Sequence, residues 1–113
     1  PNPEVEEVDL VGHAWFIPRS SVMDLWREIP YCWENGEDIQ LSYLSQKYSA
    51  TKTYVPPHPL DEPHMHSSTK GLEYGVDTKA TSHPTNHQVF YSERDNCVRN
   101  AIDNGWNPLF RRL

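Results

Sequence analysis

Apolar residues are spaced irregularly along most of the chain, but three stretches show the period of an amphipathic helix. The first covers residues 20–29, with apolar positions at i, i+3, i+4 and i+7. Those positions are Val22, Leu25, Trp26 and Ile29. Ser20 or Ser21 is a suitable N-cap, and Pro30 ends the pattern because proline lacks the backbone donor. We expect a short helix that buries its apolar face.

A second helix is predicted for residues 38–48, after a turn at Asn35-Gly36. Asp38 is its expected N-cap, and one face carries Leu41, Leu44 and Tyr48.

The third helix, residues 92–104, has the clearest end signals. Ser92 is the expected N-cap, and Asp95 stands at the third position after it, as in a capping box. Val98 and Ile102 are four residues apart and share a face. Gly105 follows the last turn, where a left-handed residue often ends a helix.

Strand signals are shorter and weaker. We expect strands at 8–17, 51–55, 71–76 and 88–91, and a solvated acidic arm at 1–7. Segment 50–87 has four prolines within eight residues and no regular period, so we expect it to be an extended, Pro- and His-rich loop. The predicted fold is a small single α+β domain over 1–113, with short strands, two or three short helices and much irregular loop.

Composition narrows the function. Hydrophobic residues make up 36% of the chain, but it holds four Trp, six Tyr and three Phe. A thin core with many aromatics is typical of a chain that packs on another protein. The main hypothesis is therefore a non-enzymatic interaction or structural protein, such as an accessory subunit of a larger assembly. The residues expected to contact its partner are Tyr54, Pro56, Pro57, Trp106, Leu109 and Phe110.

Charge and cysteine content limit the alternatives. The net charge of −6 disfavours binding to nucleic acid, and no apolar run approaches the roughly 20 residues of a membrane span. Cys32 and Cys97 belong to no Cys-x-x-Cys motif, which favours an intracellular location but leaves open whether they pair. We expect both to be small buried side chains.

The histidines suggest a metal site as an alternative. His64 and His66 form a His-x-His pair, His83 and His87 a His-x3-His pair, and His58 lies nearby. Imidazoles can complete a zinc tetrahedron, with the carboxylates of Asp61 or Glu62 as further ligands. Without such a site, these histidines belong to a polar surface loop and no cofactor is needed.

Two short motifs extend this alternative to catalysis. "PHMH" and "YSERD" resemble the metal-binding and nucleophile motifs of the HUH endonucleases, which initiate rolling-circle replication. The resemblance implies His64 and His66 as ligands of a divalent metal and Tyr91 as the nucleophile. Arg94 stands where that family has lysine, and the polar "SSTKG" follows where the family has an apolar strand.

A second alternative is a small-ligand binder with an aromatic pocket. The tryptophans that could line it are Trp15, Trp26, Trp33 and Trp106. Of these, Trp15 and Trp26 are expected in the core rather than in a pocket.

Overall fold

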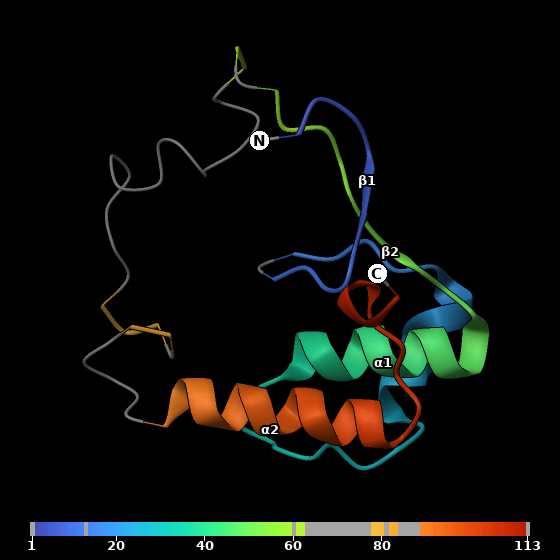
Figure 1. Ribbon diagram of the computed structural model, residues 1–113, viewed down its shortest axis with the longest axis vertical. Helices are drawn as coiled ribbons and strands as arrows, with labels where there is room; N and C mark the ends of the chain where they lie inside the picture. The colour runs from blue at the N-terminus through green and yellow to red at the C-terminus, as the bar shows by residue number, and fades with distance from the viewer. Residues whose placement is uncertain are drawn as a thin grey trace.

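The computed structural model describes residues 2–12, 14–59, 61–62, 78–80, 82–83 and 89–112. Two α-helices and a two-stranded antiparallel sheet confirm the predicted α+β class (Figure 1). The elements in order are β1 (Glu6–Val8), η1 (Arg19–Trp26), α1 (Glu37–Ser49), β2 (Thr53–Val55), α2 (Phe90–Asp103) and η4 (Leu109–Arg111). None of the helices in these ranges is long and apolar enough to cross a membrane.

Helix α1 begins after Gly36, whose φ of 86° is a left-handed conformation that glycine adopts without strain. Asp38 is in the first turn, where its carboxylate accepts a 2.9 Å hydrogen bond from the Ile39 amide. The predicted helix at 38–48 is confirmed, but Gly36 rather than Asp38 occupies the N-cap position.

Helix α1 lies at the centre of the molecule and is buried on all sides over 38–45. Helix α2 runs alongside it and η1 packs against it, as Figure 1 shows. The prediction of one apolar face was therefore incomplete, and Tyr48, expected on that face, is exposed. Polar side chains of α1 find partners in these neighbours; the Gln40 amide donates to the Glu28 carbonyl at 3.2 Å.

Helix α2 starts earlier than predicted. Its N-cap position is Val89, and the Ser92 hydroxyl in the first turn donates to the Val89 carbonyl at 2.9 Å. The expected Ser92 cap is therefore wrong, as is a strand through 91, because Phe90 and Tyr91 are already helical. The predicted end is confirmed, since Gly105 follows the helix with a φ of 107°.

The core forms where α1, α2 and the following turn meet. Its buried members are Ile39, Tyr43, Leu44, Cys97, Ala101 and Trp106. Trp106 is only 4% exposed. The expectation that Trp106 contacts a partner is therefore wrong: the turn at Gly105 folds the chain back, and the Trp106 amide donates to the Ala101 carbonyl at 2.9 Å.

Residues 19–26 form a 3-10 helix rather than an α-helix. The face that it buries is polar, whereas the sequence predicted that the apolar face would be buried. A 3-10 helix has three residues per turn, so Ser21 and Asp24 share a face, and both are buried. Asp24 accepts hydrogen bonds from Ser49 and Arg27, which compensate for its burial. Trp26 and Ile29, expected in the core, are 62% and 84% exposed.

Strands β1 and β2 pair antiparallel with Glu7 opposite Tyr54. Two expectations for the N-terminal region are wrong: residues 6 and 7, predicted in the acidic arm, belong to β1, and neither 9–12 nor 14–17 is a strand. The Asp9 carboxylate instead accepts from the Leu109 amide. The strand predicted at 51–55 is confirmed as β2, whereas that at 71–76 lies outside the described residues.

Candidate docking pocket

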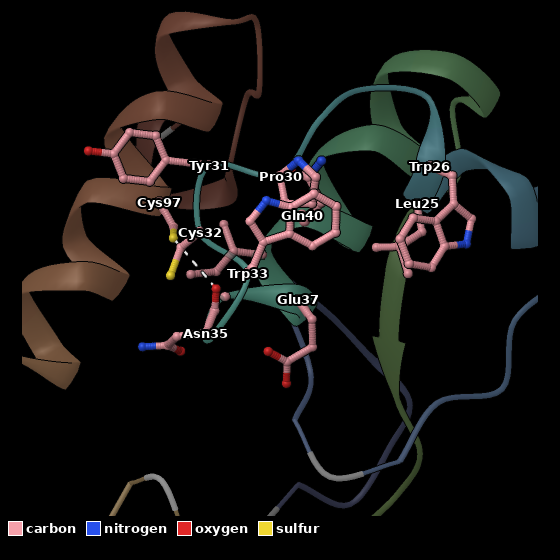
Figure 2. Close-up of a pocket in the computed structure, with 12 residues that line it drawn as sticks. Leu25, Trp26, Pro30, Tyr31, Cys32, Trp33, Asn35, Glu37, Gln40 and Cys97 are labelled. Carbon is pink, nitrogen blue, oxygen red and sulfur yellow. Dashed lines mark hydrogen bonds between the residues drawn. The ribbon is translucent and has the colours of Figure 1, made fainter. Parts of the chain in front are cut away.

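A pocket of about 120 Å³ opens between η1, the loop at 30–36 and the first turn of α1 (Figure 2). Its apolar lining includes Leu25, Trp26, Tyr31, Trp33, Ile39 and Cys97. An apolar cavity of about 150 Å³ can hold one benzene ring. This pocket is therefore of the size that accepts a single ring or branched aliphatic side chain.

The segment 22–33, which supplies most of the pocket lining, also carries large exposed apolar side chains, which we call the aromatic face. They are Val22, Met23, Trp26, Ile29, Tyr31 and Trp33, and three of them, Trp26, Tyr31 and Trp33, line the pocket itself. Trp33 is 73% exposed. Isolated apolar residues at a surface are ordinary, but large exposed ones gathered in 22–33 beside a cavity are typical of a binding site.

Two acidic residues stand beside the aromatic face. Glu34 and Glu37 are both exposed, and Glu37 lines the pocket. Within the described part of the chain, neither carboxylate takes part in a salt bridge. The rim therefore presents negative charge that an incoming cationic group can neutralise.

Polar contacts around Asn35, which lines the pocket, hold the floor of the pocket in place. The Asn35 side chain is buried, donates to the Phe90 carbonyl at 3.3 Å and accepts from Arg94 at 3.3 Å. Arg94 also binds both carboxylate oxygens of Asp38. The hydrogen bonds to Asp38 raise the pKa of the Arg94 guanidinium, so Arg94 stays charged at any ordinary pH. These contacts hold the 30–36 loop against α2.

Beside η1, a cluster of ionisable groups surrounds the Glu28 carboxylate. It accepts hydrogen bonds from Tyr43, from Lys47 at 2.7 Å and from Tyr48 at 2.7 Å. Burial alone would raise the pKa of Glu28, but the hydrogen bonds outweigh it and lower the pKa to about 2.

The pKa values of Lys47 and Tyr43, two other members of the cluster, are raised. The hydrogen bond to Glu28 raises the pKa of Lys47, and burial together with Glu28 raises the pKa of Tyr43. At neutral pH, Lys47 stays charged, Glu28 stays ionised and Tyr43 stays neutral. General acid–base catalysis requires pKa values near the working pH, so this cluster is suited to holding structure rather than to proton transfer.

The residues of the predicted metal site are only partly described. His58 and His83 are half-buried, and the His58 amide donates to the Asn2 carbonyl at 2.7 Å. His64, His66 and His87 lie outside the described residues. Among the residues that are described, no three His, Cys, Asp or Glu side chains are grouped as a metal would require.

Tyr91, the nucleophile implied by the HUH resemblance, is the second residue of α2 and is 71% exposed. Its ring meets that of Phe90 edge to face at 5.3 Å. Arg94, at the position of the family's lysine, is bound to Asp38. The two implied metal ligands lie outside the described residues, so the nuclease hypothesis stays a prediction.

The tryptophan prediction was partly right about the pocket. Trp26 and Trp33 line it, whereas Trp106 is in the core and Trp15 donates its indole N–H to the Val11 carbonyl at 2.6 Å. Tyr31 was missed. Its signal was the local sequence "WREIPYCW", in which three aromatics flank a helix-stopping proline.

Of the residues expected to contact a partner, Tyr54 and Phe110 are 53% and 56% exposed. Pro56 is exposed, while Pro57 and Leu109 are half-buried. These residues are on β2, the segment after it, and η4, away from the lining of the pocket.

Comparison of the chain with protein-family models, curated proteins and solved structures gave no match.

Proposed function

We propose that this chain is a non-enzymatic interaction protein, an accessory subunit that docks on a larger protein through its aromatic face. One observation carries the proposal: the large apolar side chains of 22–33 are exposed around a ring-sized cavity rather than buried. Aromatic residues are enriched in interface cores because they bury much area with few rotatable bonds. Exposed to water on an isolated chain, they favour association.

The pocket and its rim define the chemistry of the partner. A volume of about 120 Å³ fits one Phe, Leu or Met side chain. Glu34 and Glu37 beside it favour a Lys or Arg next to that anchor, and the net charge of −6 attracts a basic surface from a distance. We therefore expect a partner segment in which an apolar anchor is flanked by basic residues.

The rigidity of the floor supports tight binding. Arg94, Asp38 and Asn35 connect the pocket loop to α1 and α2 through hydrogen bonds. A site that is already ordered loses little conformational entropy when it binds, which improves affinity.

A small aromatic ligand is the second candidate for the same pocket. The apolar lining and the ring-sized volume favour it, but most of Trp33, which is 73% exposed, would stay uncovered by a ligand in such a small cavity. A protein segment can cover the exposed faces of Trp26, Ile29 and Trp33 as well as fill the cavity, and for that reason we prefer it.

Selection from a random peptide library displayed on phage tests the proposal. The full chain is the bait, and the Trp33→Ala variant removes binders that do not need the aromatic face. We expect enriched peptides with one large apolar residue next to Lys or Arg. Peptides that bind both proteins equally, or enrichment of acidic peptides, would refute it. Indole, titrated separately, tests the small-ligand candidate by chemical-shift changes at the pocket residues.

A further inference from the structure

Two cysteines from distant parts of the sequence meet in the wall of the pocket. Cys32 comes from the loop before α1 and is half-buried; Cys97 is in the middle of α2 and is 6% exposed. Both line the pocket, and Cys32 packs against the core cluster that contains Cys97. Figure 2 shows their two sulfur atoms next to each other in that view.

The surrounding contacts hold the loop against α2 at this point. Gly36 approaches so closely that a Cβ there would be 2.7 Å from the Cys97 sulfur. The Cys97 thiol also points toward the Asn35 carbonyl, with the sulfur 3.9 Å from the oxygen. Burial raises the pKa of the Cys97 thiol, and the neighbouring Cys32 raises it further, which agrees with a short separation of the two thiols.

We propose that Cys32 and Cys97 are a modification site: an oxidation-sensitive thiol pair that peroxide converts to a disulfide joining the pocket loop to α2. This inference does not depend on the proposed docking function. Such a bond would fix one wall of the pocket in place covalently.

The reaction balances with hydrogen peroxide as the oxidant. Cys32, the more accessible thiol, attacks the peroxide as a thiolate; its sulfur gains oxygen as a sulfenic acid, and hydroxide leaves. The Cys97 thiolate then attacks the Cys32 sulfur, the S–S bond forms, the S–O bond breaks and a second hydroxide leaves. With the two thiol protons, the sum is two thiols and one peroxide giving one disulfide and two waters.

The second step sets a characteristic pH dependence. Burial, together with the charge of Cys32, raises the pKa of the Cys97 thiol above its usual value. Only the thiolate attacks, so disulfide formation should become faster as the pH rises through the neutral range toward that pKa.

The test treats the reduced full chain with hydrogen peroxide, and peptide mapping by mass spectrometry follows both thiols. That mapping also separates oxidation of the exposed Met23. We expect the loss of two hydrogen atoms per molecule, a peptide pair joined through Cys32 and Cys97, and recovery of both thiols with dithiothreitol.

Variants that lack one of the two cysteines show whether the thiols react with each other or independently. In Cys97→Ala, Cys32 should stop at the sulfenic acid, trapped by dimedone; in Cys32→Ser, Cys97 should react at least about tenfold more slowly. A circular-dichroism melt confirms that each variant is folded. Overoxidation of Cys32 while Cys97 stays reduced in the wild-type chain, or disulfides only between molecules, would overturn the proposal. The display selection is unaffected by either outcome, because it is done under reducing conditions.

Discussion

Arg94 on α2 donates two hydrogen bonds to the carboxylate of Asp38 on α1, at 2.8 and 3.1 Å, and so joins the two main helices beside the pocket. Asp38 is almost fully buried and Arg94 only about a quarter exposed. The same Asp38 carboxylate accepts from the Ile39 amide. One ion pair therefore serves the start of α1, the packing of α2 and the floor of the candidate docking pocket.

Arg94→Gln should lower the free energy of unfolding by about 2 kcal/mol, because it leaves the buried Asp38 charge without its cation. Urea denaturation measures the change. Arg99→Gln on the same helix is the matched control, since Arg99 is exposed, and should change stability by less than about 0.5 kcal/mol. In a double-mutant cycle with Asp38→Asn the two losses should not add; additive losses would mean that the pair contributes nothing.

Gly36→Ala should destabilise the fold by more than Gly105→Ala. Both glycines have positive φ, which costs an L-residue about 1 kcal/mol, but only at Gly36 would the new Cβ overlap the Cys97 sulfur. Gly12→Ala, with open space around it, is the control for the added methyl group. Thermal melts compare the three. If Cys97→Ala gives no recovery in the Gly36→Ala background, the predicted steric contact is wrong.

Acid should weaken the fold through Glu28. Its pKa is lowered to about 2 from the ordinary 4.5, so its ionised form stabilises the folded state above pH 4.5. That contribution decreases as the pH falls from 4.5 toward 2. In Glu28→Gln, stability at neutral pH should be lower and the decline through this range shallower. Urea midpoints measured across the range test this, and parallel curves for the two proteins would contradict it.

Replacing Trp106 by alanine should destabilise the fold strongly, whereas the same replacement of Trp33 should not. Trp106→Ala removes a large buried side chain from the core and should cost about 3–5 kcal/mol of folding free energy. Trp33→Ala changes an exposed residue and should leave the free energy of unfolding within about 0.5 kcal/mol of the wild type. Differential scanning calorimetry of both variants measures these changes in stability. A large loss of stability in Trp33→Ala would show that the aromatic face is structural.

Sequence patterns located the elements whose signals are local. Gly105 marked the end of α2, and Leu44 and Ile102 followed the helical period. The segment 19–26 was predicted to bury an apolar face because its apolar residues have the spacing of an amphipathic α-helix. The hydrogen bond from Ser49, on α1, to Asp24 is a tertiary contact, and only such a contact shows why a polar face turns inward.

The pocket could be predicted only in part. Trp26 and Trp33 were recognised as possible lining, but sequence gives no means of telling them from Trp106, which is buried. The contribution of Cys97 comes from α2 packing against a loop more than sixty residues earlier in the chain. Such long-range contacts depend on how the helices pack, which cannot be predicted from hydrophobic periodicity.

The most direct test of the docking proposal compares two aromatic residues of equal exposure. Trp33 and Tyr91 are 73% and 71% exposed, but only Trp33 lines the pocket. Isothermal titration calorimetry measures the affinity of a display-selected peptide for Trp33→Ala, Tyr91→Ala and the wild type. We expect Trp33→Ala to weaken binding by at least about tenfold, and Tyr91→Ala to bind like the wild type. Equal affinity for all three proteins would contradict the proposal that the aromatic face is the docking surface.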